Sequence, residues 1–151
     1  MGYIQELRAL VGSRPLVMVG ATVLVLNTHG ELLMALRSDN NMWGVIGGAL
    51  EPGESLEENA RREAREEAGL ELGALELFGA FSGEGFFYEY PNGDQVHIVS
   101  VVYVCRTFSG NPYPADGEHR RLQWFSLRAL PEAISPTVIP ILQVLIERSQ
   151  T

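Results

Sequence analysis

Apolar residues in this chain form several strand-like runs separated by turn residues. Residues 16–26, LVMVGATVLVL, are almost continuously apolar and β-branched, which predicts a strand buried on both faces. Pro91-Asn92-Gly93-Asp94 is typical of a hairpin turn between two strands. Similar patterns predict further strands over residues 31–37, 75–81, 86–90, 96–106 and 122–125. The pattern therefore predicts six strands along the chain.

Helical spacing marks the two ends of the chain. Residues 3–11 place four apolar side chains on one face, and Gly12 can end that helix. Thr137 is predicted to cap a closing helix that runs through Arg148. The first of these helices is expected to pack on the domain or to serve in a dimer.

A third helix is predicted in the middle of the chain, after a loop that includes Gly48. Ser55 and Glu58 form a capping-box pattern at its start, and Gly69 suits the position just after its end. Its apolar stripe recurs at every fourth position, at Leu56, Ala60, Ala64 and Ala68. Because alanine is small, this stripe predicts a close approach to a sheet.

The opposite face of the same helix carries carboxylates. Glu63, Glu66 and Glu67 stand at i, i+3 and i+4, so their charges converge and repel one another. A hard divalent cation would offset that repulsion, because such ions bind carboxylate oxygens. Arg62 stands four residues before Glu66 and can hold that carboxylate in place, while Glu54 can reach the cluster from the preceding loop.

This stretch, Gly48 to Leu70, resembles the signature box of the Nudix hydrolases, G-x5-E-x7-R-E-U-x-E-E-x-G-U, where U is a bulky aliphatic residue. The one departure is Ala64 at the first U. The invariant positions are all present, at Gly48, Glu54, Arg62, Glu63, Glu66, Glu67 and Gly69. The resemblance implies the Nudix fold, an α+β structure in which a mixed sheet lies between helices as an α/β/α sandwich. It also implies one Nudix domain over residues 1–151, with the helix at 3–11 packed on it.

The resemblance further implies a metal-dependent pyrophosphohydrolase that uses Mg²⁺ or Mn²⁺ to cleave a nucleoside diphosphate linked to another group. The metal ligands it implies are the carbonyl of Gly48 and the carboxylates of Glu63, Glu66 and Glu67. Its candidates for the catalytic proton acceptor are Glu63, Glu67 and Glu118, with His119 as an alternative. Glu54, Arg62 and Gly69 would orient these groups.

Three residues outside the box are candidate substrate contacts. Arg37 can contact phosphate, Trp43 lies in the segment that the family usually writes W-x-L-P-G-G, and Tyr88 can stack on a base. Tyr88 also stands where dinucleoside polyphosphate hydrolases of the family carry a tyrosine. The leaving group stays open among nucleotide sugars, dinucleoside polyphosphates and nucleoside triphosphates.

Composition limits the binding partners, the cellular location and the disulfide bonds that are expected for this protein. The formal net charge of −8 over 151 residues argues against binding of duplex nucleic acid. No apolar run is long enough to span a membrane, and the first twelve residues lack the regions of a signal peptide, so a cytoplasmic protein is expected. Cys105 is the only cysteine, which excludes an internal disulfide.

Two rival functions fit the same fold. A nucleotide-sensing module would bind without cleaving, and intact metal-ligand carboxylates argue against it. A diphosphate isomerase would need a reactive cysteine in the pocket, whereas Cys105 lies in a strand pattern. The family resemblance alone makes a homodimer an expectation.

Overall fold

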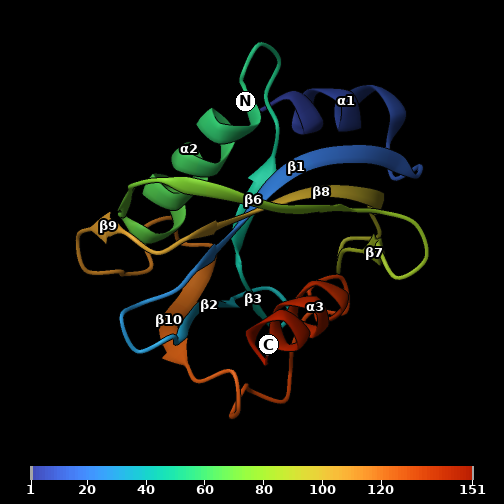
Figure 1. The fold of residues 1–151 in the computed structure, drawn as a ribbon. Helices are drawn as coiled ribbons and strands as arrows, with labels where there is room; N and C mark the ends of the chain where they lie inside the picture. The colour runs from blue at the N-terminus through green and yellow to red at the C-terminus, as the bar shows by residue number, and fades with distance from the viewer. Residues whose placement is uncertain (1, 151) are drawn as a thin grey trace.

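A computed structural model describes residues 2–150, and its main sheet is mixed. Four strands follow the order β4-β1-β8-β6, and β7 pairs with β8 beside β6. Strands β1 and β8 run parallel over ten paired residues, whereas the other pairs are antiparallel (Figure 1). The strands of this sheet are β1 (Leu16–Val25), β4 (Ile46–Ala49), β6 (Leu75–Phe81), β7 (Phe87–Glu89) and β8 (Gln95–Cys105).

Two smaller antiparallel sheets flank the main one. The first has the order β10-β2-β3, and the second pairs β5 with β9. Their strands are β2 (Leu32–Arg37), β3 (Trp43–Gly44), β5 (Glu71–Leu72), β9 (Phe108–Ser109) and β10 (His119–Phe125). The predicted strand at 122–125 therefore begins three residues earlier, at His119.

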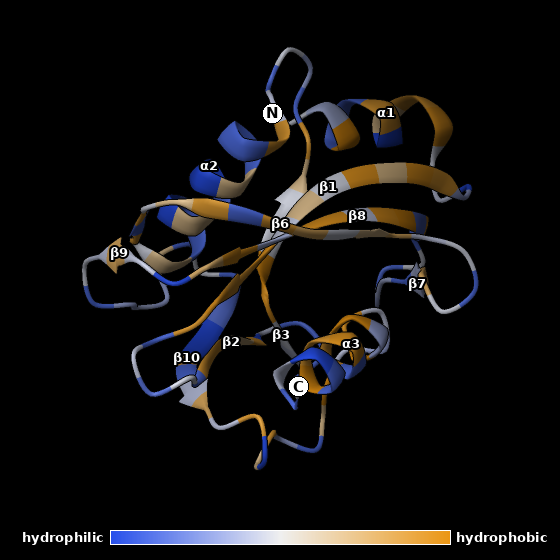
Figure 2. Cartoon of the chain, in the orientation of Figure 1, coloured by the Kyte–Doolittle hydropathy of each residue, from blue (hydrophilic) through white to orange (hydrophobic). Residues whose placement is uncertain are grey.

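Helices cover both faces of the main sheet, as the predicted α/β/α sandwich requires. The helices are α1 (Tyr3–Val11), α2 (Leu56–Ala68) and α3 (Ile139–Ser149). The fully buried alanines of α2 pack with Val23 and Tyr103 on one face, while α3 packs with Leu24 and Val102 on the other. Hydrophilic residues lie along the outer side of α2 (Figure 2). None of the helices described within residues 2–150 has the length and apolar character of a membrane span.

The prediction that residues 16–26 are buried on both faces is wrong for the first half of β1. Val17 is 72% exposed and Val19 is 38% exposed, whereas Val23 is fully buried. The α2 alanines cluster with the second half of the strand, from Ala21 onward, and α1 contributes no buried residue of its own. The apolar run therefore predicts the strand correctly, but it does not show which residues of the strand a helix covers.

The loop expected at the start of the box is also wrong, because Gly48 lies in β4. Gly47 and Gly48 pair with Thr22 and Ala21 of β1. A Cβ atom on Gly47 would lie 2.6 Å from the Ala21 carbonyl oxygen, so only glycine permits this approach. The closing helix likewise has Val138 and not Thr137 at its N-cap, and its first residue is Ile139.

Candidate active site

Helix α2 has both of the predicted caps. The Ser55 hydroxyl accepts a hydrogen bond from the Glu58 N–H (3.1 Å), and the Glu58 carboxylate accepts one from the Ser55 N–H (2.9 Å). Gly69 adopts the left-handed conformation, φ 67°, and its N–H donates to the Arg65 carbonyl (3.0 Å). These caps define the length of the helix, and the buried alanine stripe sets its rotation about its axis. Together they turn the carboxylates toward β4.

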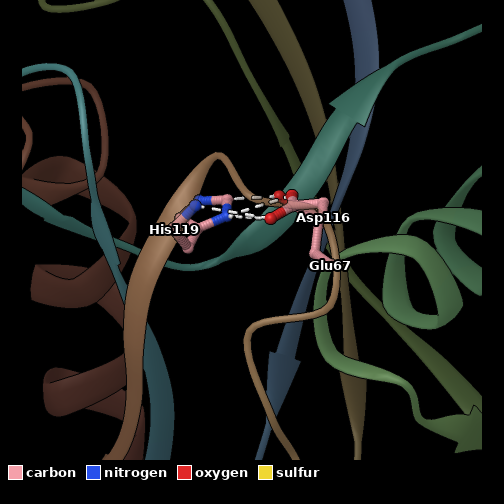
Figure 3. Close-up of side chains that lie close together, drawn as sticks. All are labelled: Glu67, Asp116 and His119. Atoms are coloured by element: carbon pink, nitrogen blue, oxygen red, sulfur yellow. Dashed lines mark hydrogen bonds and ion pairs between the residues drawn. The ribbon is translucent and has the colours of Figure 1, made fainter.

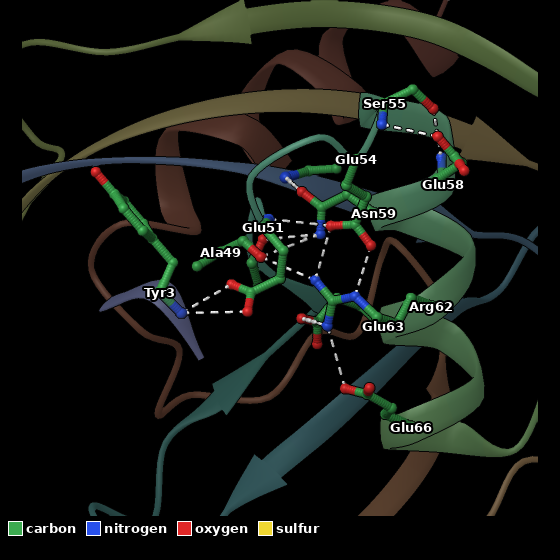
Figure 4. Close-up of polar contacts among 12 residues, drawn as sticks. Tyr3, Ala49, Glu51, Glu54, Ser55, Glu58, Asn59, Arg62, Glu63 and Glu66 are labelled. Carbon is green, nitrogen blue, oxygen red and sulfur yellow. Dashed lines mark hydrogen bonds and ion pairs between the residues drawn. The ribbon is translucent and has the colours of Figure 1, made fainter. Parts of the chain in front are cut away.

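Arg62 contacts several carboxylates of the box, and the predicted pairing with Glu66 is among these contacts (Figure 4). Its guanidinium donates to both oxygens of Glu54, at 2.7 and 3.0 Å, and to Glu63 at 2.8 Å. It also reaches Glu66 at 3.2 Å and the Ala49 carbonyl at 2.9 Å. The hydrogen bonds from Arg62 keep the pKa of Glu54 below its usual value. Arg62 therefore connects the loop before α2, the helix itself and β4.

Glu63 and Glu67 are the two box carboxylates that the fold removes most from water. Burial raises the pKa of Glu63 to about 7, although Arg62 opposes that change. Burial, and then the charge of Glu63, raise the pKa of Glu67 well above its usual value. The Gly47 N–H donates to Glu67 Oε1 (2.9 Å) and fixes its orientation. Such carboxylates ionise readily only beside added positive charge, which a divalent cation would supply.

These carboxylates line one concave site, which we call the acidic cleft. Its volume is about 420 Å³, within the range of small-molecule sites. Glu66 lies at its rim, since its side chain is 56% exposed. The acidic residues that line the cleft are Glu51, Glu63, Glu66, Glu67, Asp116 and Glu118; Gly47, Gly48, Arg37 and Arg62 line it as well. The cleft thus gathers every metal ligand that the box implies.

A second cluster joins the cleft to the loop before β10 (Figure 3). His119 is 6% exposed; its Nε2 lies 3.7 Å from Glu67 Oε2, and its Nδ1 lies 3.2 Å from Asp116 Oδ2. Glu67, Asp116 and His119 offer ligand atoms within 4.8 Å of one another, so this group could also hold a metal ion. Asp116 was not among the predicted site residues, although it stands two residues before Glu118, the acidic candidate that the family resemblance implies in this region.

Asn59 is a site residue that sequence reasoning missed. It is fully buried in α2, where its Oδ1 accepts from the Ala21 N–H (2.9 Å). Its Nδ2 donates toward the carbonyls of Gly48 (3.3 Å) and Ala49 (3.4 Å). Asn59 therefore joins β1 and β4 to the helix. Its position in the box admits any residue, so the motif gave no signal.

Gly20 is a second missed residue, and it leads to a prediction. A Cβ atom there would lie 2.4 Å from the Gly48 carbonyl oxygen and 3.0 Å from its carbonyl carbon. We expect Gly20→Ala to push β4 away from β1 and to lower the free energy of unfolding by about 1–3 kcal/mol. Urea unfolding measures this change.

Gly44→Ala is the matched control for that prediction. Gly44 also lies in a strand, β3, and a Cβ atom there meets nothing within 4 Å. If the two variants unfold at the same urea concentration, the close approach of Gly20 to Gly48 does not contribute to stability.

The candidates outside the box divide between the cleft and the core. Glu118 is exposed and lines the cleft, as its proposed role requires. Arg37 lines the cleft too, but it is paired with Asp39 through two hydrogen bonds of 2.9 and 3.0 Å. Tyr88 lines a smaller pocket next to the cleft, and its hydroxyl accepts a hydrogen bond from Asn40.

Trp43 has a different environment from the one expected. Its ring packs edge-on against Phe125, at 4.9 Å between centroids, beside the core that α3 covers. It is not among the residues that line the acidic cleft or the two pockets beside it. The structure thus shows a packing contact for Trp43, and its contact with a substrate stays a prediction.

Cys105 lies away from the cleft. It is fully buried, and its Sγ donates to the Thr107 carbonyl oxygen (3.1 Å). It packs with the core cluster under α2 and lines none of the pockets beside the box. A mechanism that needs a reactive cysteine is not supported by this placement.

Comparisons with known proteins agree with the box. The family model described as the NUDIX domain matches residues 17–145. An NAD-capped RNA hydrolase, NudC, from Pseudomonas aeruginosa is 34% identical over 113 residues, which are 73% of this chain and 37% of that protein. The oxidized purine nucleoside triphosphate hydrolase of Mus musculus is 37% identical over 91 residues, 60% of this chain and 53% of that protein. The chain thus spans about a third to a half of the length of these relatives.

Solved structures share the fold. The crystal structure of a MutT NUDIX hydrolase from Burkholderia pseudomallei superposes with a TM-score of 0.71 at 28% identity. The match covers 86% of this chain and 97% of that one. The NUDIX domain of Shewanella oneidensis NrtR, crystallised with ADP ribose, has a TM-score of 0.69 at 16% identity and supports the fold alone.

Proposed function

This chain belongs to the Nudix family, and we propose that it is a metal-dependent pyrophosphohydrolase acting on a nucleoside diphosphate linked to another group. One observation carries the proposal. Glu63 and Glu67 are held side by side in a cleft where burial raises the pKa of both. Such an arrangement is costly for folding and is useful where a cation binds.

The residues of the cleft fit a divalent cation. Glu63, Glu66, Glu67 and the Gly48 carbonyl supply hard oxygen ligands, which suit Mg²⁺ or Mn²⁺. A bound ion would neutralise the diphosphate and lower the pKa of a water molecule. Arg62 orients this set through its bonds to Glu54, Glu63 and Glu66.

The reaction that we propose is attack of water on one phosphorus of the diphosphate. The bond between that phosphorus and the bridging oxygen breaks, and a carboxylate takes the proton from the water. Glu63, Glu67 and Glu118 are the candidates for this role, since each lines the cleft. Arg37, also in the cleft, would contact a phosphate after exchanging Asp39 for it.

A hydrolysis screen tests the proposal. The purified protein is incubated with Mg²⁺, with Mn²⁺ or with a chelator, and phosphate-containing products are separated by chromatography. The panel holds dinucleoside polyphosphates, nucleotide sugars and nucleoside triphosphates, together with oxidised purine nucleotides and NAD, which the names of the relatives suggest. We expect turnover of at least one class with a divalent ion and none with the chelator. Tight binding of a nucleotide without turnover would instead favour a sensing module.

A further inference from the structure

A second pocket opens directly from the acidic cleft, and its lining is different in character. The two share Met18, Gly47, Gly48 and Tyr90. This second pocket, which we call the apolar pocket, has a volume of about 150 Å³, and no charged side chain lines it. Its apolar walls are Met18, Val45, Phe86, Ile98, Val138 and Ile141. A ligand group that enters it must be neutral and largely apolar.

Four residues that carry a hydroxyl group interrupt these apolar walls: Thr22, Tyr90, Ser100 and Thr137. Thr22 on β1 and Ser100 on β8 both line the pocket, and their oxygens lie 2.7 Å apart. The ladder pairs Ser100 with Gly20, which has no side chain to cover it. The next residues along the same face, Leu24 and Val102, are apolar and buried. On this face of the sheet, polar side chains therefore take the place of apolar core residues at the pocket.

The pair cannot use all of its own hydrogen-bonding capacity. Two hydroxyls carry two hydrogens, and only one of them is consumed by the contact between Thr22 and Ser100. Within residues 2–150, neither hydroxyl has another hydrogen-bond partner. One O–H and several lone pairs thus remain for a ligand. Because either oxygen can be the donor, the pair can offer a hydrogen to one ligand and accept one from another.

The size and position of the pocket indicate which part of a substrate it receives. An apolar cavity of about 150 Å³ is large enough to hold a benzene ring. A substrate with its diphosphate in the acidic cleft could place a neighbouring ring here, because the two sites are continuous through Gly47 and Gly48. We propose that Thr22 and Ser100 recognise the polar edge of a nucleobase in the apolar pocket and so determine which base the enzyme prefers. This inference rests on the proposed function.

Base preference is the property to measure. The values of kcat and KM are determined with Mg²⁺ for the four common nucleoside triphosphates, using wild type, Thr22→Val and Ser100→Ala. We expect the ratio of kcat/KM between the best and the worst base to fall about tenfold in each variant, which is the worth of one hydrogen bond. The decrease in kcat/KM for the preferred base should come from a higher KM, with kcat unchanged. Thr22→Ser keeps the hydroxyl and should keep the wild-type preference.

Other outcomes contradict this inference but leave the proposed hydrolase function unaffected. An unchanged base ratio in both variants would overturn it, and so would a wild type that treats all four bases alike. A general loss of packing would change kcat/KM for every base equally and would appear as a lower temperature of unfolding. A general loss of packing would therefore leave the ratio of kcat/KM between bases unchanged.

Failure of the proposed function is recognised separately, as absence of turnover on the whole panel. Calorimetric titration with the four nucleoside monophosphates then decides the inference alone. Tenfold weaker binding of the preferred base by Thr22→Val and Ser100→Ala, but not by Thr22→Ser, would support it. Equal binding by all four proteins, or no binding by wild type, would overturn it.

Discussion

Glu67→Gln is expected to lower kcat about 10³-fold in the presence of Mg²⁺, a loss typical of removing a metal ligand or a general base. Glutamine keeps the shape of the side chain and an oxygen that can still accept from the Gly47 N–H. What it removes is the negative charge of a group that is 6% exposed. Steady-state hydrolysis of the best substrate from the panel measures the loss.

The control for this variant is Glu57→Gln, on the same helix. Glu57 is exposed in the first turn of α2 and does not line the acidic cleft. Its substitution should change kcat by less than about twofold, because a solvated surface charge contributes little. If wild type and Glu67→Gln turn over the substrate equally, Glu67 does not take part in the mechanism. The proposal of a metal-dependent reaction is then contradicted as well.

The second large effect is expected in the pH dependence of stability. The folded-state pKa of Glu63 is about 7, and that of Glu67 is raised in the same direction, from usual values of 4.5. The folded protein without metal therefore binds more protons than the unfolded chain above pH 4.5. Its free energy of unfolding should fall as pH rises from 5 to 8, by on the order of 3 kcal/mol for Glu63 alone.

A divalent cation should reverse that trend, since it binds the ionised carboxylates and displaces their protons. We expect Mg²⁺ to raise the temperature of unfolding more at pH 8 than at pH 5. Urea unfolding at several pH values, with Mg²⁺ and with a chelator, gives both quantities. Groups with lowered pKa, such as Asp39 and Glu54, change stability only below this window.

Glu63→Gln separates the contribution of Glu63 from any other pH dependence of stability between pH 5 and 8. The variant keeps the volume of the side chain and cannot ionise, so its metal-free stability should vary less with pH than that of wild type. If the free energy of unfolding, measured with a chelator, varies equally with pH in the two proteins, ionisation of Glu63 does not cause the pH dependence.

Much of helix α2 could be predicted because its signals are local. The Ser55 and Glu58 cap, the Gly69 stop and the buried alanine stripe all depend on residues within a few turns of one another, and all are observed. The approach of Arg62 to Glu66 follows from the same spacing. The Nudix fold followed from the box, since a family carries its fold with its motif.

Errors arose where a residue's environment comes from distant parts of the chain. Val17 has the same apolar character as Val23, but only Val23 lies beneath α2. Trp43 follows the family pattern, but that pattern does not predict the packing of its ring against Phe125. Gly48 was expected in a loop and lies in a strand, because β1 pairs with it.

By itself, the sequence determined the caps, the apolar stripe and the carboxylate spacing of α2, since a helix has a known repeat and brings i, i+3 and i+4 together wherever it forms. Only the tertiary structure decided that Glu67 is buried against Gly47 and that Asn59 joins α2 to both β1 and β4. It alone placed Thr22 beside Ser100, which lies 78 residues further along the chain. The physical reason is that burial and desolvation depend on which surfaces meet, and a strand's own residues do not specify what packs against it.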